Sequence, residues 1–542
     1  MARPVTDGFS WTRPQLAPRR LPSRGARKET LRPGRAVGEC ARRPRHPHAA
    51  VKLTAQETRM SSLRGRITGG QQAPADRGHV AHFAGDGPPP AWQAAVDAVT
   101  AAHEAFPSWS ASAPSERSAV LMHAAHLLML RTGRIVQTMA AETGAAGPWA
   151  AFNAKLAAQF LLDAAAAAVR PGGQVMPASS EGSCSLQVRV PLGVIAALTP
   201  RHAPLLMAAR AVALPLALGN AVVLKPSEAA PVAGGMLLRE VLIEAGLPDG
   251  VLTVVSHDAD DAEDAAELGR ALVADRRVRA VTFTGSATAG RQVAVAAARH
   301  LKPALIEAGG KNSLLVLDDA DVEYAANAAV VSSFLNAGQG GLSTERIFVD
   351  RTLADDFLAR LAEKVTRPDR TGPTWPAEVT GAMSDPRAAR RVAALVADAL
   401  AKGATAVTGT GRLDEDTACL APVVLTDVTA DMDIWSQEVA GPVVTVHVVD
   451  GTDEAVALAG TPPCGPTAGV ITRDWAAGLD VARRLPARAV HVNNRAADPV
   501  QAPFGHLTDS GYGPQAGLIG IEYFTETRWI TAGVLGRPDF PL

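Results

Sequence analysis

The feature that most constrains the fold is a regular alternation of short apolar runs and amphipathic segments after Val190. Short apolar runs bounded by turn residues are typical of buried strands, and the segments between them have the three- and four-residue apolar spacing of helices. Strands that alternate with helices form a parallel sheet with helices on both faces. The sequence predicts strands at 194–198, 221–224, 251–255 and 278–283, and helices at 204–218, 231–245 and 260–274.

Further regions complete the expected α/β architecture. A second alternation of strands and helices occupies about 312–500, and helices are expected over about 89–146 and 148–169. Extended runs punctuated by glycines indicate a hairpin at 176–190. A chain of 542 residues is long enough for two or three domains that share substantial cores.

The N-terminal segment differs from the rest in charge. Residues 1–59 hold 14 Lys and Arg but 4 Asp and Glu, a net charge of +10 in a chain whose net charge is −1. A basic segment can bind nucleic acid or a membrane. We favour a disordered extension without such partners, because the segment is rich in Pro and Arg and has little apolar surface to bury. Met60 looks like a more usual start of the chain, so residues 1–59 are interpreted as upstream reading frame or as a disordered extension.

The cysteines indicate a reduced setting. The chain has 4 of them, scattered without the spacing of metal ligands, so no metal site is expected. No apolar stretch near Met1 resembles a secretory signal, and the alanine-rich runs are too short to span a bilayer. The sequence therefore predicts a cytoplasmic protein. The cysteines are Cys40, Cys184, Cys419 and Cys464.

Two segments carry the signal of a nucleotide site. Lys225, Ser227 and Glu228 follow the strand at 221–224, where a cation and an acid could hold ribose hydroxyls; a surface Lys–Glu pair is the alternative. The second segment runs from Phe283 through Gly285 and Ser286 to Gly290, where a strand ends in a small-residue turn before a helix. Such a turn offers backbone N–H groups to a pyrophosphate. Gly409 and Gly411 have similar spacing but no long strand before them, and are interpreted as a loop.

Three more segments carry candidate residues of a cofactor or catalytic site. Glu307 precedes Gly309-Gly310-Lys311, and a carboxylate placed there could act as a general base; an acid before a tight turn is the alternative. Glu438 lies just before a Gly-Pro turn, and its alternative is an ordinary loop acid. The third segment runs from Ser333 to Arg346 and includes Gly341.

Together these segments resemble the aldehyde dehydrogenase superfamily. The stretch 333–346 resembles its nucleophile segment, Phe-x-Asn-x-Gly-Gln-x-Cys followed by an Arg, but Gly341 stands where the reactive Cys is expected. Further stretches, among them 310–321, 342–346 and 524–530, are similar to the aromatic branch of vanillin, benzaldehyde and salicylaldehyde dehydrogenases. The matches to the nucleophile segment are Phe334, Asn336, Gly338, Gln339 and Arg346.

The resemblance implies a role for each candidate residue. Glu307 would be the general base, His202 occupies the position of an oxyanion-stabilising Asn, and Arg210 would lie at the substrate tunnel. An acid at Glu228 favours NAD over NADP, because it would repel a 2′-phosphate. Ala440 replaces an aromatic residue near the nicotinamide. The implied NAD contacts are Thr199, Lys225, Ser227, Glu228, Gly285, Ser286, Gly290 and Glu438.

The resemblance also implies a domain plan and an assembly. A Rossmann-type NAD-binding domain would cover 76–306 and a second α/β, catalytic domain 307–525, after a basic extension at 1–75. The hairpin at 176–190 and a C-terminal strand in 526–542 would form a small β element for a homodimer or homotetramer.

Without the thiol, three functions remain open. The first is an NAD-binding protein that is impaired or silent in the oxidation of an aromatic aldehyde, acting as a scaffold or regulator. The second is a residual oxidation of the aldehyde hydrate with Glu307 as base. The third is a nucleic-acid- or membrane-associated protein that acts through the basic segment.

Overall fold

The computed structural model describes most of the chain from Ala91 to Gly533. The described ranges are 91–170, 172–178, 182–256, 262–366, 371–372, 375–376, 382–414, 418–494, 500, 502, 505–506, 510–514 and 517–533, and they belong to one unit, Ala73–Leu542. The predictions for the basic segment 1–59, for Met60 and for the residues after 533 lie outside the described residues.

The predicted N-terminal helices are present. Glu116 Oε2 accepts a hydrogen bond from Ala113 N at 3.0 Å, which caps the second helix at its start, Pro114. The third helix ends at Gly144, whose φ of 65° suits a left-handed terminus. The helices are α1 (Ala91–Ala111), α2 (Pro114–Leu130), α3 (Thr132–Thr143) and α4 (Gly147–Ala168).

The predicted alternation after Val190 forms a seven-stranded sheet in the order β19-β20-β7-β6-β3-β4-β5. The strands from β3 to β7 are parallel, and β20 is antiparallel to β7. β19 and β20 thus belong to the first sheet, although the predicted domain bounds assign their residues to the second domain. The strands are β3 (Val194–Leu198), β4 (Ala221–Lys225), β5 (Leu252–Val254), β6 (Val278–Gly285), β7 (Ala304–Ala308), β19 (Gly505–His506) and β20 (Gly511–Pro514).

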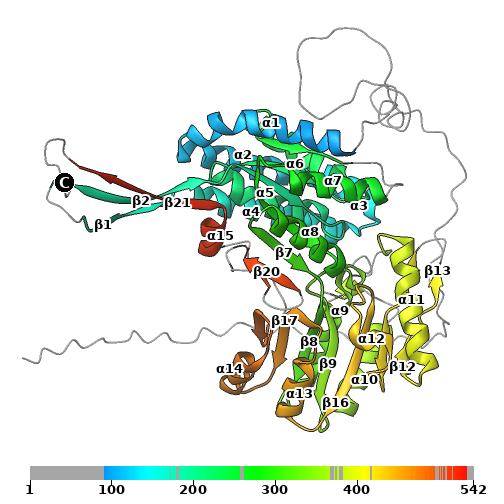
Figure 1. The fold of residues 1–542 in the computed structure, drawn as a ribbon. Helices are drawn as coiled ribbons and strands as arrows, with labels where there is room; N and C mark the ends of the chain where they lie inside the picture. The colour runs from blue at the N-terminus through cyan, green and yellow to red at the C-terminus, as the bar shows by residue number, and fades with distance from the viewer. Residues whose placement is uncertain are drawn as a thin grey trace, which may run out of the picture. The chain divides into compact units, whose positions relative to one another are not determined.

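Helices cover both faces of this sheet, as predicted (Figure 1). Successive residues of a strand point to opposite faces. Ile195 and Ala197 therefore join the core formed with α2, α4 and α5, whereas Val194 and Ala196 join the core formed with α1 and α7. The helices that follow the strands are α5 (Pro204–Ala217), α6 (Leu237–Glu244), α7 (Ala262–Ala274) and α8 (Ala287–Arg299).

The predicted helix at 231–245 differs in its first turns. It begins as a π-helix, η1 (Val232–Met236), and continues as α6. Gly235 lies so close to β5 that a Cβ on it would be 2.6 Å from Val254 Cγ1. The carboxylate of Glu142 accepts hydrogen bonds from the first two backbone N–H groups of η1, at 2.9 and 2.8 Å. The π-helical turn of η1 therefore depends on tertiary contacts with β5 and with Glu142.

The second alternation forms another seven-stranded sheet, β12-β15-β16-β9-β8-β17-β18, in which only β12 is antiparallel to its neighbour. Its strands are β8 (Lys311–Val316), β9 (Thr344–Asp350), β12 (Thr405–Thr408), β15 (Val423–Thr426), β16 (Val443–Val449), β17 (Cys464–Ile471) and β18 (Ala489–Val492). Its helical segments are α9 (Val322–Phe334), η2 (Leu335–Gly338), α10 (Ala354–Thr366), α11 (Pro386–Ala401), α12 (Asp433–Ser436), α13 (Thr452–Ala459) and α14 (Trp475–Arg484).

Short strand pairs connect parts of this region. β10 (Thr371–Gly372) pairs with β11 (Trp375–Pro376), and β13 (Leu413–Asp414) pairs with β14 (Cys419–Leu420). Gly409 and Gly411 lie in the loop between β12 and β13, as interpreted from the sequence.

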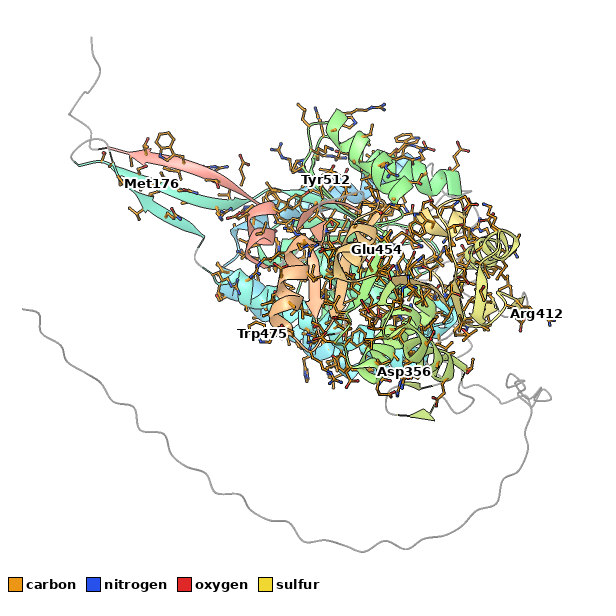
Figure 2. All side chains as sticks on the ribbon, turned by 90° about the horizontal axis from the view of Figure 1, so that it is seen from below. Met176, Asp356, Arg412, Glu454, Trp475 and Tyr512 are labelled. Atoms are coloured by element: carbon orange, nitrogen blue, oxygen red, sulfur yellow. The ribbon has the colours of Figure 1, made fainter. Side chains whose placement is uncertain are left out.

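The predicted hairpin is also present, as β1 (Gly173–Met176) antiparallel to β2 (Cys184–Pro191). β21 (Thr525–Ala532) pairs with β2 along its whole length and follows α15 (Gly517–Tyr523). These three strands extend away from the helices around the first sheet (Figure 1), and Met176 marks them in the second view (Figure 2). In the part of the chain that the structure describes, no helix combines the length and apolar character needed to cross a membrane.

Candidate functional site

The carboxyl ends of β3, β4 and β6 lie side by side and bring the predicted cofactor residues together. Leu198, the last residue of β3, pairs with Lys225 on one side and with Phe283 on the other. Thr199 follows directly, and its backbone N–H donates to the carbonyl of Lys225 at 3.0 Å. This edge of a parallel α/β sheet is where such folds bind ligands.

Lys225 and Glu228 form an ion pair with each other. The pair proposed as the alternative to ribose binding therefore exists, but Lys225 is buried rather than on the surface. Ser227, between them in the sequence, is half-buried. A buried cation and its acid at the end of a strand can still form hydrogen bonds with the hydroxyl groups of a ligand.

The predicted pyrophosphate turn leads into α8. β6 ends at Gly285, and the side chain of Ser286 caps the helix by accepting from Ala289 N at 3.3 Å. The backbone N–H of Gly290 donates to the carbonyl of Ser286 at 2.8 Å. The first turn of α8 carries no acidic side chain, so its positive end favours an anion.

The Thr199 hydroxyl indicates that this edge suits a polar ligand. Thr199 is buried, and no hydrogen-bond partner for its Oγ1 exists among the described residues. Buried hydroxyls are normally hydrogen-bonded. The residues at this edge therefore fit a dinucleotide, with a hydroxyl, a Lys–Glu pair and a helix N-terminus available to it.

Glu307, the candidate base, is the second-last residue of β7. It pairs in register with Thr284 on β6 and with Gly511 on β20, and it is only 2% exposed. One carboxylate oxygen forms an ion pair with Arg210, and the other accepts from Thr284 Oγ1 at 3.1 Å. Arg210, which the resemblance assigned to the substrate tunnel, is thus buried on α5 with its guanidinium directed at Glu307.

Gly309 and Gly310 carry the chain from the first sheet to the second through a crowded space. A Cβ on Gly309 would overlap the carboxylate of Glu438. A Cβ on Gly310 would lie 2.6 Å from Ser510 Oγ and 2.7 Å from the carbonyl of Cys464. Glu438 therefore lies directly against the segment that follows Glu307.

Gly341 lies in the loop before β9 and is hydrogen-bonded to the segment that follows Gly309 and Gly310. The Asn312 side chain donates to the carbonyls of Gly341 and Ser343, both at 2.9 Å. A Cβ on Gly341 would meet no atom of the described part of the chain within 4 Å, and its φ lies outside the left-handed region. Unlike Gly309, this position has space and a backbone suitable for a side chain.

A hydrogen bond connects Asn336, in the segment before Gly341, to His202, the residue at the predicted oxyanion position. Its side chain donates to the carbonyl of His202 at 3.1 Å, and Trp149 Nε1 donates to the same oxygen at 3.2 Å. Burial, followed by the charges of Arg201 and Arg210, lowers the pKa of His202 to about 4. His202 is therefore neutral at pH 7 and can donate a single N–H.

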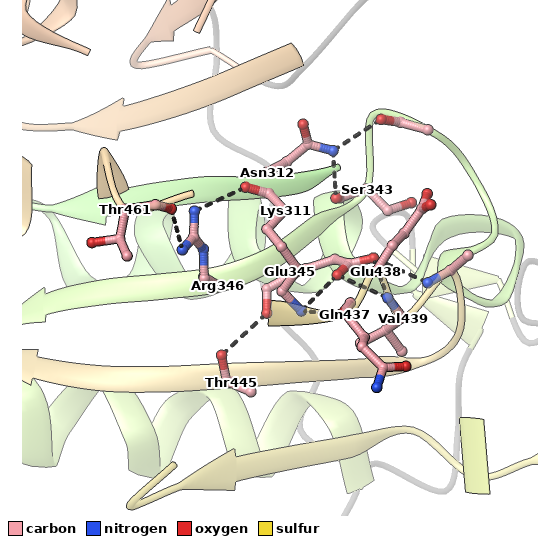
Figure 3. Close-up of polar contacts among 12 residues, drawn as sticks. Lys311, Asn312, Ser343, Glu345, Arg346, Gln437, Glu438, Val439, Thr445 and Thr461 are labelled. Atoms are coloured by element: carbon pink, nitrogen blue, oxygen red, sulfur yellow. Dashed lines mark hydrogen bonds and ion pairs between the residues drawn. The ribbon is translucent and has the colours of Figure 1, made fainter. Parts of the chain in front are cut away.

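A buried network surrounds Glu438 (Figure 3). Lys311 Nζ lies 2.8 Å from Glu345 Oε2 and donates to the carbonyl of Gln437 at 3.0 Å. Glu345 also accepts from the backbone N–H groups of Val439, at 2.9 and 3.0 Å, and Ala440, at 3.0 Å. Lys311 and Glu345 thus hold the loop on both sides of Glu438.

The surroundings change the acidity of Glu438. Burial is the main cause, and the charge of Glu345 the second, of a pKa raised to about 7, although Arg391 and Lys311 act in the opposite direction. Arg391 on α11 also donates to the carbonyls of Glu438 and Val439, at 2.8 and 2.6 Å. Glu438 is therefore close to half-protonated at neutral pH.

Glu345 and Arg391 were not predicted from the sequence. Glu345 had a signal, because Lys311 and Glu345 are charged residues in segments otherwise typical of buried strands, and a buried charge requires a partner. Arg391 had none, since it is one of several arginines on an amphipathic helix. Among the described residues, no three potential ligand side chains gather to hold a metal ion.

Comparison with known families and sequences shows what the chain is similar to. The model of the aldehyde dehydrogenase family matches residues 74–530. A vanillin dehydrogenase from Pseudomonas fluorescens is 43% identical over 80% of this chain and 89% of its own length. A salicylaldehyde dehydrogenase from Pseudomonas sp. strain C18 is 38% identical over 81% and 89%. A benzaldehyde dehydrogenase named for NAD(+), from Pseudomonas putida, is 35% identical over 80% and 88%.

Solved structures have the same fold. A salicylaldehyde dehydrogenase from Pseudomonas putida G7, complexed with salicylaldehyde, superposes with a TM-score of 0.78 and 36% identity, covering 83% of this chain and 92% of that one. An indole-3-acetaldehyde dehydrogenase complexed with NAD+ superposes with a TM-score of 0.76 and 30% identity, covering 82% and 89%. The α/β architecture and the aromatic-branch resemblance expected from the sequence are confirmed.

Proposed function

Because the chain belongs to the aldehyde dehydrogenase family, we propose that it is an NAD-binding member of the aromatic branch whose oxidation of aldehydes is impaired or silent. Gly341 stands at the position of the nucleophilic cysteine and has no group that can attack a carbonyl carbon. Nucleophilic catalysis divides aldehyde oxidation into two easier steps, and this chain lacks the atom that begins the first.

One observation carries the proposal. Among the described residues, no atom lies within 4 Å of where a side chain at Gly341 would project, and Asn312 ties this loop to the segment that also carries Glu307. A glycine required for packing would have close neighbours at its Cβ position, and one required for its backbone would have a left-handed φ. Gly341 has neither feature. The surroundings of a reactive side chain therefore remain, while the side chain itself is missing.

The candidate site residues divide into two groups. NAD, when bound, would supply the acceptor for a hydride. Thr199, the Lys225–Glu228 pair, Ser227 and the turn at Gly285–Gly290 would bind its adenosine and pyrophosphate, and Glu438 its nicotinamide ribose. The acid at Glu228 favours NAD over NADP. Glu307 would accept a proton, and neutral His202 could donate to a developing oxyanion.

The test restores the missing thiol. We expect Gly341→Cys to raise NADH production from benzaldehyde, salicylaldehyde or vanillin on the order of 10³-fold or more over the native chain. Gly341→Ser is the matched control, because it fills the same space with a much weaker nucleophile. A native rate equal to that of Gly341→Cys would refute the proposal.

A second candidate is favoured by the position of Glu307 beside Arg210. The hydrate of an aldehyde would lose an O–H proton to Glu307 and its C–H hydride to NAD, giving the carboxylic acid without a covalent intermediate. The Arg210 cation favours the ionised carboxylate that this step needs. A native NADH rate that disappears in Glu307→Gln would support this route over a silent site.

We also propose that the protein forms a homodimer or homotetramer through β1, β2 and β21. Side chains on these strands are exposed, including Val175 at 81% and Trp529 at 71%. The outer edge of β21 faces no further strand among the described residues. Light scattering after size exclusion should give a dimer or tetramer, and Trp529→Asp should shift it toward monomer; a monomeric native chain would contradict the assignment.

Two further proposals concern the domain bounds and the location of the protein. The domain bounds near 306 are supported by the crossing at Gly309–Gly310, where β7 ends one sheet and β8 begins the other. A cytoplasmic location is supported by free thiols at Cys184, Cys419 and Cys464.

A further inference from the structure

The loop Gln437–Gly441, which carries Glu438, is fixed by three charged side chains from three different elements. Lys311 comes from β8, Glu345 from β9 and Arg391 from α11. Between them they bond the carbonyls of Gln437, Glu438 and Val439 and the N–H groups of Val439 and Ala440. Five polar backbone atoms around Glu438 are therefore held by distant side chains, and Figure 3 shows those that bind Lys311 and Glu345.

This loop needs such support because its backbone is strained. Ala440 has a φ of 46°, which a residue other than glycine seldom adopts. Glu345 accepts from the N–H group of Ala440 itself and from that of Val439. The carboxylate thus fixes the conformation that turns the chain immediately after Glu438.

The charges of the network are not explained by stability alone. Lys311 and Glu345 are 1% and 4% exposed, and burying such a pair seldom stabilises a fold more than apolar residues of similar size would. A carboxylate, however, can accept from two successive N–H groups and from an ammonium at once. The geometry suits the task of holding a loop in one position.

We propose that Glu345 and Arg391 are positioning residues that hold Glu438 against Gly309, where its carboxylate meets the nicotinamide ribose of the cofactor. The inference rests on the proposed NAD binding and adds which residues keep its nicotinamide end in place. Glu345, paired with Lys311, acts from the buried side of the loop, and Arg391 acts from the exposed side.

The test compares two ligands that differ at the nicotinamide end. NAD and ADP share the adenosine and pyrophosphate, but ADP has no nicotinamide ribose. In the full-length chain, Glu345→Gln should weaken NAD binding by about tenfold or more, while the Kd for ADP changes less than about twofold. Arg391→Met should do the same, and Glu438→Gln, measured alongside, should show the same ligand selectivity.

Matched controls separate positioning from general weakening. Asp319 lies beyond the other end of β8 and accepts from two successive N–H groups, those of Arg473 and Asp474, at 3.0 and 2.9 Å. Asp319→Asn and Arg387→Met, the latter on the same helix as Arg391, should leave both affinities unchanged.

The outcomes are distinct. Equal loss of NAD and ADP binding in Glu345→Gln and Arg391→Met, or no loss of either, would overturn the inference while leaving the proposed function intact. If the native chain binds neither ligand at millimolar concentration, the proposed function fails and this inference with it. If Glu345→Gln does not fold, the exposed Arg391→Met alone decides.

Discussion

The pair Arg210–Glu307 determines what the candidate base can do. Both side chains are nearly inaccessible, at 4% and 3%, so each charge depends on the other. Removing one partner of a buried pair leaves an uncompensated charge, which costs far more than the loss of an exposed pair. Arg210 therefore contributes both to the ionisation of Glu307 and to the stability of the site.

Replacing Arg210 should show this dependence. We expect Arg210→Met to lower the free energy of unfolding by about 3–5 kcal/mol. Arg134→Met, which breaks the exposed pair with Glu240 at 2.7 Å, should change it by less than about 1 kcal/mol. Urea unfolding followed by circular dichroism measures both. Equal effects of the two substitutions would mean that Glu307 does not depend on Arg210.

At the scale of elements, the strands and helices that depend on local sequence patterns were predicted from the sequence. The strands β3, β4, β5 and β6 of the first sheet are short apolar runs, so their positions and the helices between them were predicted to within a few residues. The π-helix was not predicted, because it depends on the approach of Gly235 to Val254, 19 positions later in the chain. Glu345 and Lys311 were not predicted as partners either, since their contact requires β8 to pair with β9 in one register.

The close approach of Gly235 gives a prediction for η1. Gly235→Ala should destabilise the protein by about 1–3 kcal/mol, because the methyl group would press on Val254. Gly133→Ala is the control: it lies in α3 with no atom within 4 Å of its Cβ, and it should stabilise by up to about 1 kcal/mol. Thermal unfolding of the two variants should shift in opposite directions, and a shared direction would contradict the packing argument.

For the whole molecule, titrating groups with opposite effects set the response to acid. Burial lowers the pKa of His202 and of His447 to about 4, so both are neutral in the fold but bind protons in the unfolded chain below about pH 6.5. Their contribution is present above pH 6.5 and is lost as the pH falls toward 4. Glu438, whose pKa is raised to about 7, acts in the opposite direction, because the folded chain holds its proton more tightly.

The contribution of His202 can be isolated. Between pH 7 and pH 4.5 the unfolding free energy of His202→Asn should fall by about 2–3 kcal/mol less than that of the native chain, since Asn does not titrate. Denaturant titrations at several pH values measure the difference. Parallel curves for the two proteins would show that His202 is not buried in its neutral form.

The open position at residue 341 gives the molecule a practical use. A cysteine introduced there could carry a small thiol-reactive fluorophore, because no atom of the described residues lies within 4 Å of its Cβ and the backbone accepts a side chain. Its emission would report the arrival of a dinucleotide or an aromatic ring at the neighbouring groups. The position proposed for the missing thiol would then serve as an attachment point for an optical sensor.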